Sequence, residues 1–163
     1  MIMIKVTPLN DTCKDEFARL FGLYYRELDC ADDTAHLIDE YILPDLLAGL
    51  IKIDMLSEEG KYIGFVIYQK DDIDNDWNLK EGWGDIREIF VEAPCRRKGY
   101  GKFLLFTAEM KLMESGVQKA YCLPYEGAEK FFTACGYAKT EDYVEEMDCR
   151  IFEKASLKNC CNE

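Results

Sequence analysis

The feature that most constrains the fold is a strand, a basic loop and a helix in direct succession. Residues 85–91 are rich in β-branched and aromatic side chains, which is typical of a strand. Pro94 and the glycines Gly99 and Gly101 follow, and such residues interrupt regular structure. The apolar positions of residues 103–110 then fit a broad helix face. The sequence therefore predicts a strand that is joined to a helix by a short glycine-containing loop.

The loop between this strand and this helix has the chemistry of an anion site. The first amides of a helix have no acceptor within the helix, and the helix dipole favours negative charge near them. Because glycine has no Cβ, the backbone at Gly99 and Gly101 can approach a ligand closely. Positive charges gather at the same point, on Arg96, Arg97, Lys98 and Lys102. These features predict a phosphate site, with a diphosphate as the best match.

The spacing Arg96-x-x-Gly99-x-Gly101 resembles the Gln/Arg-x-x-Gly-x-Gly/Ala signature of the GNAT superfamily of N-acetyltransferases. An ordinary basic turn that begins a helix is the alternative, but strand, Pro94, loop and helix also follow the order of that family. Residues 86–91 are similar to the family's fourth strand. The resemblance implies an α/β GNAT fold, with a central mixed sheet of six to seven strands flanked by about four helices.

The resemblance also implies which residues hold the cofactor, acetyl-coenzyme A. In the family, loop amides hold the diphosphate, and strand-four backbone holds the pantetheine arm. Carried over by position, the pantetheine contacts are Ile89, Phe90 and Val91. The diphosphate contacts are Arg96, Arg97, Lys98, Gly99, Tyr100, Gly101 and Lys102. Tyr125 stands in the place of a family asparagine and completes the expected set.

Glu88 is the candidate general base. Acyl transfer to an amine needs a neutral nitrogen, whereas a lysine-like ammonium with a pKa of about 10.4 is mostly protonated at neutral pH. A base must therefore remove a proton, and Glu88 lies just upstream of the expected pantetheine contacts. Several family members use a strand-four glutamate in this way. The alternatives are an ion pair with a basic neighbour, or orientation of the substrate.

The chain departs from the family pattern after the helix. Ala128, Phe131 and Gly136 match the family's downstream motif, but Phe132 stands where a tyrosine usually protonates the departing thiolate. A phenyl ring cannot donate a proton. A thiol with a pKa near 8.5 is a tolerable leaving group without help. Tyr125 and Tyr137 are the substitutes to consider, and packing is the alternative role for each.

Composition excludes several functions. The net charge is −12, from 32 acidic and 20 basic residues, which argues against binding to nucleic acid or to anionic membranes. No apolar run approaches the roughly 18 residues of a membrane span, and the first residues do not resemble a signal peptide. The eight cysteines show no C-x-x-C spacing and His36 is the only histidine, so no metal site is expected. These features favour a cytoplasmic protein with reduced thiols.

Periodicity gives the order of the remaining elements. We expect strands at residues 2–6, 50–56, 62–69, 83–91, 119–123 and 148–154, with a turn at 57–60. We expect a first helix after a cap at Asp11 or Thr12. A second helical region spans residues 35–50, with a break or kink at Pro44. Two further helices run from the basic loop to Ser115 and across residues 126–135. Residues 1–157 are predicted to form a single domain, and residues 158–163 a polar tail.

The function predicted from this resemblance is direct transfer of an acetyl group from acetyl-coenzyme A to an amine. The acceptor is a small molecule or a protein amine, and the resemblance leaves a homodimer open. A covalent intermediate on Cys95 is the less favoured route, because no histidine lies near it in sequence. The alternative function is a non-catalytic module that binds coenzyme A. A dinucleotide-binding domain fits less well, because Leu104 occupies the place of the third glycine in G-x-G-x-x-G.

Overall fold

The computed structural model describes residues 1–30 and 33–157, and its strands form one mixed sheet. Seven strands of the described chain pair in the order β1-β2-β3-β4-β5-β7-β6. They are β1 Ile4–Pro8, β2 Lys52–Glu58, β3 Lys61–Lys70, β4 Gly84–Val91, β5 Ala120–Cys122, β6 Ala138–Val144 and β7 Cys149–Lys154. β4 and β5 are parallel, whereas β1–β2, β5–β7 and β6–β7 are antiparallel. The predicted α/β class and mixed sheet are confirmed.

The helices within residues 1–30 and 33–157 begin with α1, Lys14–Glu27. A second helical path consists of α2 Thr34–Leu37, a π-helix Ile38–Ile42 and α3 Leu43–Leu47, and is followed by α4 Tyr100–Glu114 and α5 Glu129–Ala134. No helix in this part of the chain is long and apolar enough to cross a bilayer.

The start of α1 differs from the sequence prediction. α1 is capped neither by Asp11 nor by Thr12: its N-cap is Cys13, and the side chain of Asn10 instead accepts a hydrogen bond from the amide of Thr12. As expected, the helical region around Pro44 is divided into short pieces: α2, the π-helix and α3 follow one another, and Pro44 falls in the first turn of α3, a position that tolerates proline. The wider π-helical turn lies directly before it.

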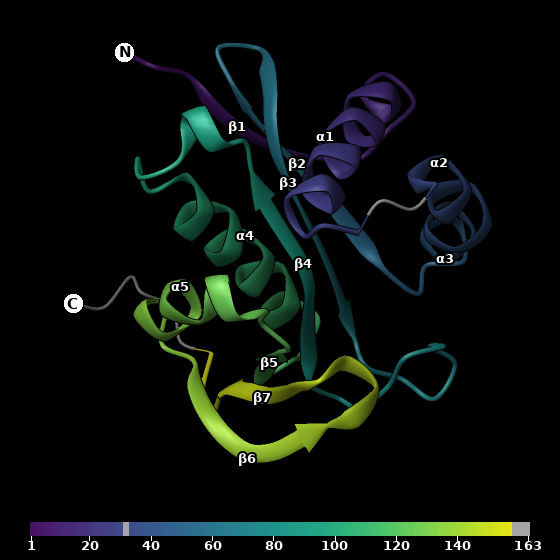
Figure 1. Cartoon of the computed structure of the whole chain (residues 1–163), viewed down its shortest axis with the longest axis vertical. Coiled ribbons are helices and arrows are strands. Elements are labelled where there is room, and N and C mark those ends of the chain that lie inside the picture. The colour runs from purple at the N-terminus through teal and green to yellow at the C-terminus, as the bar shows by residue number, and fades with distance from the viewer. Residues whose placement is uncertain (31–32, 158–163) are drawn as a thin grey trace. The chain divides into compact units, whose positions relative to one another are not determined.

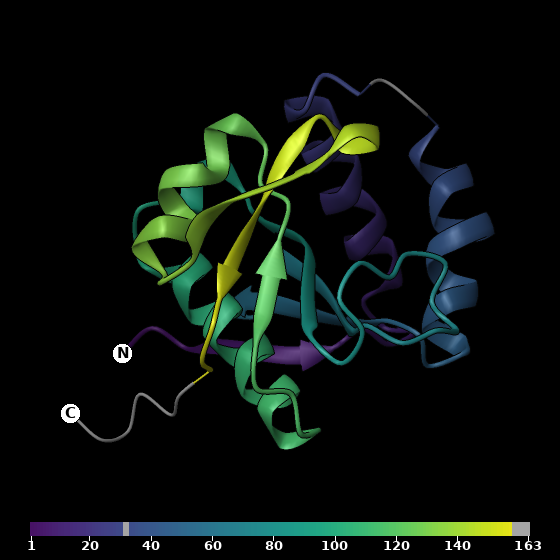
Figure 2. The ribbon, with the colours of Figure 1, turned by 90° about the horizontal axis from the view of Figure 1, so that it is seen from below.

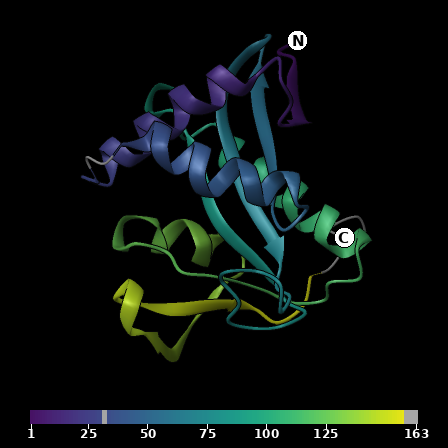
Figure 3. The ribbon, with the colours of Figure 1, turned by 90° about the vertical axis from the view of Figure 1, so that its right-hand side faces the viewer.

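The chain divides into two compact units, of which the first consists of Met1–Ile67 and Glu88–Thr107. Its core is formed by α1 and the α2–α3 path, which lie on the same face of β2 and β3 (Figure 1 and Figure 3). Aromatic rings dominate this core, and Phe65 contacts Phe17, Tyr24 and Phe90 with ring centroids 5.2 to 5.9 Å apart. Apolar burial of this kind is the main stabilising contribution to the unit.

The hairpin between β2 and β3 is tighter than predicted. Its turn consists of Glu59 and Gly60, with φ values of 50° and 81°. Two consecutive residues with positive φ are typical of the two-residue turns that match the twist of paired strands. Ser57 and Glu58 therefore belong to β2 rather than to the turn.

The second unit consists of Tyr68–Arg87 and Ala108–Glu163. Figure 2 shows β5 beside β7, and β6 follows β7 at the edge of the sheet. β6 was not among the strands that periodicity predicted, because almost all of its residues are exposed and it lacks a buried apolar face. α4 packs closely on β4 in this unit, where a Cβ at Gly84 would lie 2.7 Å from Leu112 Cδ1.

A buried carboxylate orders the long loop between β3 and β4. Asp71 is 1% exposed, and its Oδ2 accepts hydrogen bonds from the amides of Leu79 and Lys80 at 3.0 Å each and from the hydroxyl of Tyr121 at 2.6 Å. Oδ1 accepts from the side-chain amide of Gln69 at 2.8 Å. Burial, together with nearby carboxylates, raises the pKa of Tyr121 well above its ordinary value, so this hydroxyl remains a donor.

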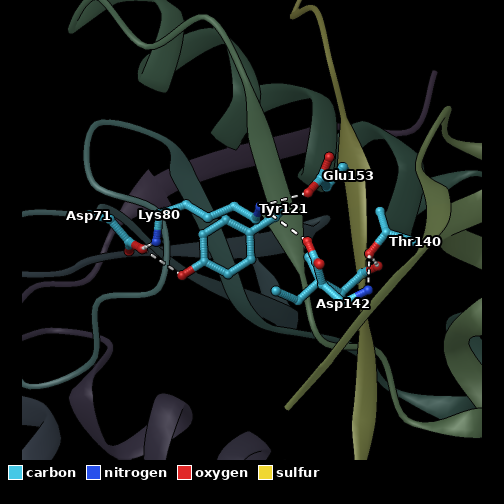
Figure 4. A network of polar contacts seen from close by, with 7 residues as sticks. Asp71, Lys80, Tyr121, Thr140, Asp142 and Glu153 are labelled. Atoms are coloured by element: carbon cyan, nitrogen blue, oxygen red, sulfur yellow. Dashed lines mark hydrogen bonds and ion pairs between the residues drawn. The ribbon is translucent and has the colours of Figure 1, made fainter.

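Lys80 extends this polar network to the strands at the edge of the sheet. Figure 4 shows Asp71 facing the hydroxyl of Tyr121, while the side chain of Lys80 reaches toward β7 and β6. The Lys80 ammonium lies 2.7 Å from the carboxylate of Glu153 and 3.7 Å from that of Asp142. The loop is therefore fixed by backbone bonds to one buried acid and by a cation that pairs with two others.

We expect Asp71→Ala to destabilise the protein by about 3 kcal/mol, because it leaves buried amide and hydroxyl donors without their acceptor. Chemical denaturation monitored by circular dichroism measures the change. Asp76→Ala is the matched control, since Asp76 is an exposed aspartate of the same loop, and its expected effect is below about 0.5 kcal/mol. Equal effects of the two substitutions would contradict the role assigned to Asp71.

Candidate functional site

The site begins on β4, beyond the part of the strand that pairs with β5. The parallel register runs from Gly84↔Ala120 to Ile86↔Cys122, and β4 then continues to Val91. In this continuation Glu88 and Ile89 are half-buried, and Phe90 and Val91 are buried. The backbone of Ile89, Phe90 and Val91 is the one predicted to contact a pantetheine arm, and Glu88 is the predicted general base.

β3 and β4 approach each other unusually closely at this point. A Cβ added at Gly64 would lie 2.5 Å from the carbonyl oxygen of Phe90 and 3.3 Å from Val91 Cγ2. Only glycine is compatible with this spacing without a shift of the backbone. One residue further, the amide of Glu92 donates to the carbonyl of Ile63 at 2.8 Å. Gly64 therefore sets the position of the end of β4.

A salt bridge from α1 supports the same end of the strand. Glu92 is largely buried, and its Oε1 accepts a hydrogen bond from Arg19 at 2.6 Å. Arg19 also donates to the carbonyl of Tyr62 at 3.0 Å. One guanidinium thus connects α1 to both strands at the point where β4 ends.

The basic loop, residues 96–102, follows β4 after a 3-10 turn at Ala93–Cys95. Two of its residues adopt left-handed backbone conformations, Arg97 with φ 63° and Gly99 with φ 83°. A Cβ at Gly99 would have no atom within 4 Å, so the space beside this residue is open. α4 begins at Tyr100, and its opening amides have no acceptor within the helix. The predicted strand, loop and helix are confirmed in this order.

The cations of the basic loop do not all have the same environment. Arg97, Lys98 and Lys102 are exposed. Arg96 instead turns toward the strand and α1: its Nε donates to the carbonyl of Val91 at 2.7 Å, and one terminal nitrogen donates to Glu27 Oε2 at 2.6 Å. Its guanidinium carbon also lies 5.4 Å from the centroid of the Phe90 ring. All four cations are thus exposed, but Arg96 donates hydrogen bonds to protein groups, and the Lys98 ammonium lies 5.9 Å from the centroid of the Tyr100 ring.

Tyr100 anchors the other end of the basic loop. Its hydroxyl donates to Glu58 Oε1, at the end of β2, at 2.6 Å. This hydrogen bond to a carboxylate is the main cause that raises the pKa of Tyr100 to about 12, with partial burial as the second cause. The phenol therefore remains a donor throughout the physiological pH range. Glu27 and Glu58 were not predicted from the sequence, because no local pattern shows a contact between residues so far apart.

The candidate proton donors of the second unit differ in exposure. Tyr125 is 51% exposed and precedes the 3-10 turn Glu126–Ala128, whereas Phe132 is buried in α5. Tyr137 is 2% exposed, and its hydroxyl donates to Glu109 Oε1 at 3.0 Å. Burial raises the pKa of Tyr137 well above its ordinary value. Tyr137 is therefore a core residue, which is the alternative role that the sequence left open for it.

Two cysteines of the second unit differ in burial. Cys122 is buried, and burial raises the pKa of its thiol well above the ordinary range. Cys135 is only partly buried. Cys160 and Cys161 lie outside the described residues. Within residues 1–30 and 33–157, no three histidine, cysteine, aspartate or glutamate side chains gather as they would around a metal ion.

Several solved acetyltransferase structures superimpose on this chain. An acetyltransferase of the GNAT family from Staphylococcus aureus Mu50 superimposes with a TM-score of 0.74 at 17% identity, over 96% of this chain and 100% of that one. PaiA N-acetyltransferase from Thermoplasma acidophilum in complex with coenzyme A gives 0.69 at 14% identity, over 94% and 99%. N-acetylglutamate synthase from Neisseria gonorrhoeae, complexed with coenzyme A and N-acetylglutamate, gives 0.70 at 15% identity, over 96% and 36%.

The sequence itself is diagnostic of the family. The pattern of the acetyltransferase (GNAT) family matches residues 15–137, which include β4, the basic loop and α5. The chain therefore belongs to the GNAT acetyltransferase family. Among curated proteins, no sequence matches this chain.

We expect Gly64→Ala to destabilise the protein by about 2 kcal/mol, because the new methyl group overlaps the carbonyl of Phe90. Gly22→Ala is the matched control: Gly22 lies within α1, where the nearest atom to a new Cβ is Thr34 Oγ1 at 3.7 Å. That substitution should stabilise the protein by roughly 0.5–1 kcal/mol through helix propensity. Urea denaturation compares the two, and a neutral Gly64→Ala would refute the close approach.

Proposed function

We propose that this protein transfers an acetyl group from acetyl-coenzyme A to an amine acceptor. The observation that carries the proposal is the basic loop, in which left-handed Arg97 and Gly99 precede the open amides of α4 and exposed cations surround them. Main-chain donors and cations at a helix start are suited to a diphosphate. The open space beside Gly99 fits a ligand that approaches the backbone.

The proposed cofactor site extends from the basic loop along the end of β4. Ile89, Phe90 and Val91 supply backbone groups for the pantetheine arm, and Tyr125 is the remaining proposed contact. Coenzyme A is present in the related PaiA and N-acetylglutamate synthase structures, which supports this choice of cofactor. Bound at this site, the cofactor supplies an activated acetyl thioester.

Glu88 is the proposed general base, in its half-buried position on β4. It accepts a proton from the ammonium of the acceptor, directly or through water, so that the neutral nitrogen attacks the thioester carbon. The new bond is C–N, the broken bond is C–S, and the electron pair of that bond leaves with the coenzyme A sulfur. The second proton that the attacking nitrogen sheds passes to water. Backbone amides of β4 donate hydrogen bonds to the carbonyl oxygen as it gains negative charge.

The side chains near α5 decide how the thiolate is protonated. Phe132 cannot donate a proton, and the hydroxyl of Tyr137 is buried against Glu109. Tyr125 has an exposed hydroxyl and is the remaining tyrosine of this motif. We propose that the thiolate leaves unassisted or receives its proton from Tyr125. Transfer is direct, with no acetyl group on Cys95.

Several further properties belong to the same proposal. Residues 1–157 form one acetyltransferase domain, which is supported by a family match that draws on both compact units. The protein is cytoplasmic, which is supported by the free thiols of all six described cysteines. The acceptor is a small-molecule or protein amine, and the protein is a monomer or a homodimer.

A second function is favoured by one observation, the phenyl ring of Phe132 in the place of the family's tyrosine. In this alternative the protein binds coenzyme A and transfers nothing. Release of free thiol from acetyl-coenzyme A, measured against a panel of small amines, polyamines and peptides, distinguishes the two. Coenzyme A binding without turnover on any acceptor would favour the binding module.

Coenzyme A binding tests the proposed use of the basic loop. We expect wild-type protein to bind it in isothermal titration calorimetry, and Gly99→Ala to weaken binding about tenfold, because a Cβ at φ 83° is strained and obstructs the ligand. Gly82→Ala is the matched control, since Gly82 has the same φ of 83° and equally open surroundings but lies in the β3–β4 loop. An equal loss of affinity in both variants would contradict the proposed site.

Glu88→Gln tests the general base. We expect kcat for acetyl transfer to fall by about 10²-fold or more, while the dissociation constant for coenzyme A stays unchanged, because the substitution removes only the proton acceptor. Thiol release measures the first quantity and calorimetry the second. Glu81→Gln, at an exposed glutamate of the β3–β4 loop, is the control. An unchanged kcat in Glu88→Gln would exclude this role.

A further inference from the structure

The basic loop is bonded to a carboxylate at each of its two anchored ends. At its first residue, Arg96 pairs with Glu27, the last residue of α1, at 2.6 Å. At the start of α4, Tyr100 donates to Glu58 at 2.6 Å. Both acids come from parts of the first unit that are distant in sequence. An acid beside a site for a diphosphate is unexpected, because it repels the ligand.

Arg96 is geometrically committed to the protein. Its planar guanidinium joins three groups: the carbonyl of Val91, the carboxylate of Glu27 and the ring of Phe90. Two of these groups belong to the end of β4, which is also the proposed pantetheine strand. Arginine can make such a forked contact, whereas lysine supplies only a single point charge. The guanidinium therefore fixes the basic loop relative to β4.

Tyr100 performs the same task with a neutral group. Its hydroxyl carries no charge that would attract a phosphate, and it is directed to Glu58 at the end of β2. Between the two anchors lie Arg97, Lys98 and Gly99, which are exposed and include both left-handed residues of the loop. Residues 97–99 are thus an exposed segment between two hydrogen-bonded residues, Arg96 and Tyr100, and the Lys98 ammonium lies 5.9 Å from the centroid of the Tyr100 ring.

We infer that Arg96 and Tyr100 are positioning residues that act through Glu27 and Glu58, and that the exposed cations of the basic loop are the ones that meet the diphosphate. The inference rests on the proposed function. It divides the positive charges of the loop into two roles. Arg96 sets the distance between the diphosphate site and β4, while Arg97, Lys98 and Lys102 supply attraction.

The direction in which Glu27→Gln changes the affinity for coenzyme A distinguishes this inference from direct binding of phosphate by Arg96. If Arg96 is a positioning residue, Glu27→Gln loosens the loop and weakens coenzyme A binding. If Arg96 is itself a phosphate ligand, Glu27→Gln removes a competitor and a repulsive charge, so binding becomes tighter. Because the pair is isolated and half-exposed, its loss costs little stability, and the variant remains folded.

The experiment is calorimetric titration of coenzyme A into the wild-type protein and its variants, with folding checked by circular dichroism. We expect Glu27→Gln and Arg96→Gln each to raise the dissociation constant about threefold to fivefold, the range open to a single half-exposed pair. The double variant should be no weaker than Arg96→Gln alone, because both substitutions remove one interaction. Glu58→Gln and Tyr100→Phe should behave in the same way: each weakens coenzyme A binding, and the double variant is no weaker than Tyr100→Phe alone.

Three controls complete the comparison. Asp15→Asn removes an exposed carboxylate from the first turn of α1 and should leave affinity unchanged. Arg97→Gln should weaken binding additively with Glu27→Gln, because it removes a charge that meets the ligand. Arg96→Lys keeps the charge but not the fork, so it should bind as weakly as Arg96→Gln; wild-type affinity in this variant would favour direct phosphate binding.

The outcomes separate this inference from the function on which it rests. Wild-type protein that does not bind coenzyme A would overturn both. Wild-type protein that binds, with Glu27→Gln binding equally or more tightly, would overturn the positioning role alone. Weaker binding in Glu27→Gln, without further loss in the double variant, supports it.

Discussion

The close approach of β3 and β4 at Gly64 is the constraint on which the rest of the first unit depends. With no side chain at this position, the carbonyl of Phe90 lies 2.5 Å from where a Cβ would be. The end of β4 is held there by backbone contacts, by the Arg19–Glu92 pair and by the bond from Arg96 to the carbonyl of Val91. The basic loop therefore starts from a point that is fixed by backbone contacts and by an ion pair, and its exposed charges follow beyond that point.

Much of this fold was predictable because its strongest signals are local. The strand, loop and helix around Gly99 follow from β-branched residues, glycines and an apolar helix face, all within one segment. β6 lacked such a signal, since its exposed, charged residues form a strand only by pairing with β7. Pro44 was a local signal for a division of the helical region, but the π-helix Ile38–Ile42 that precedes it had no such signal.

The backbone path of the site could be predicted from the sequence, whereas the contacts of its side chains could be predicted only in part. Positive φ at Gly99 follows from residue type, but the same conformation at Arg97 does not. The sequence gives Arg96, Arg97, Lys98 and Lys102 as four equivalent cations, whereas Glu27 separates Arg96 from the others. That contact joins residues 69 positions apart, and Tyr100 and Glu58 are 42 apart. Pairing over such distances is a property of the tertiary structure, which no short motif encodes.

The carboxylate of Asp71 also determines the order in which parts of the second unit can become complete. Its amide partners at Leu79 and Lys80 follow within the same loop, but the hydroxyl of Tyr121 lies 50 residues further along the chain. During synthesis on the ribosome, this acid emerges long before the hydroxyl does. Until then the Asp71 carboxylate requires water in place of that partner, so the loop between β3 and β4 cannot exclude water before β5 has been made. Translation thus imposes a sequence of events that refolding of the whole chain does not.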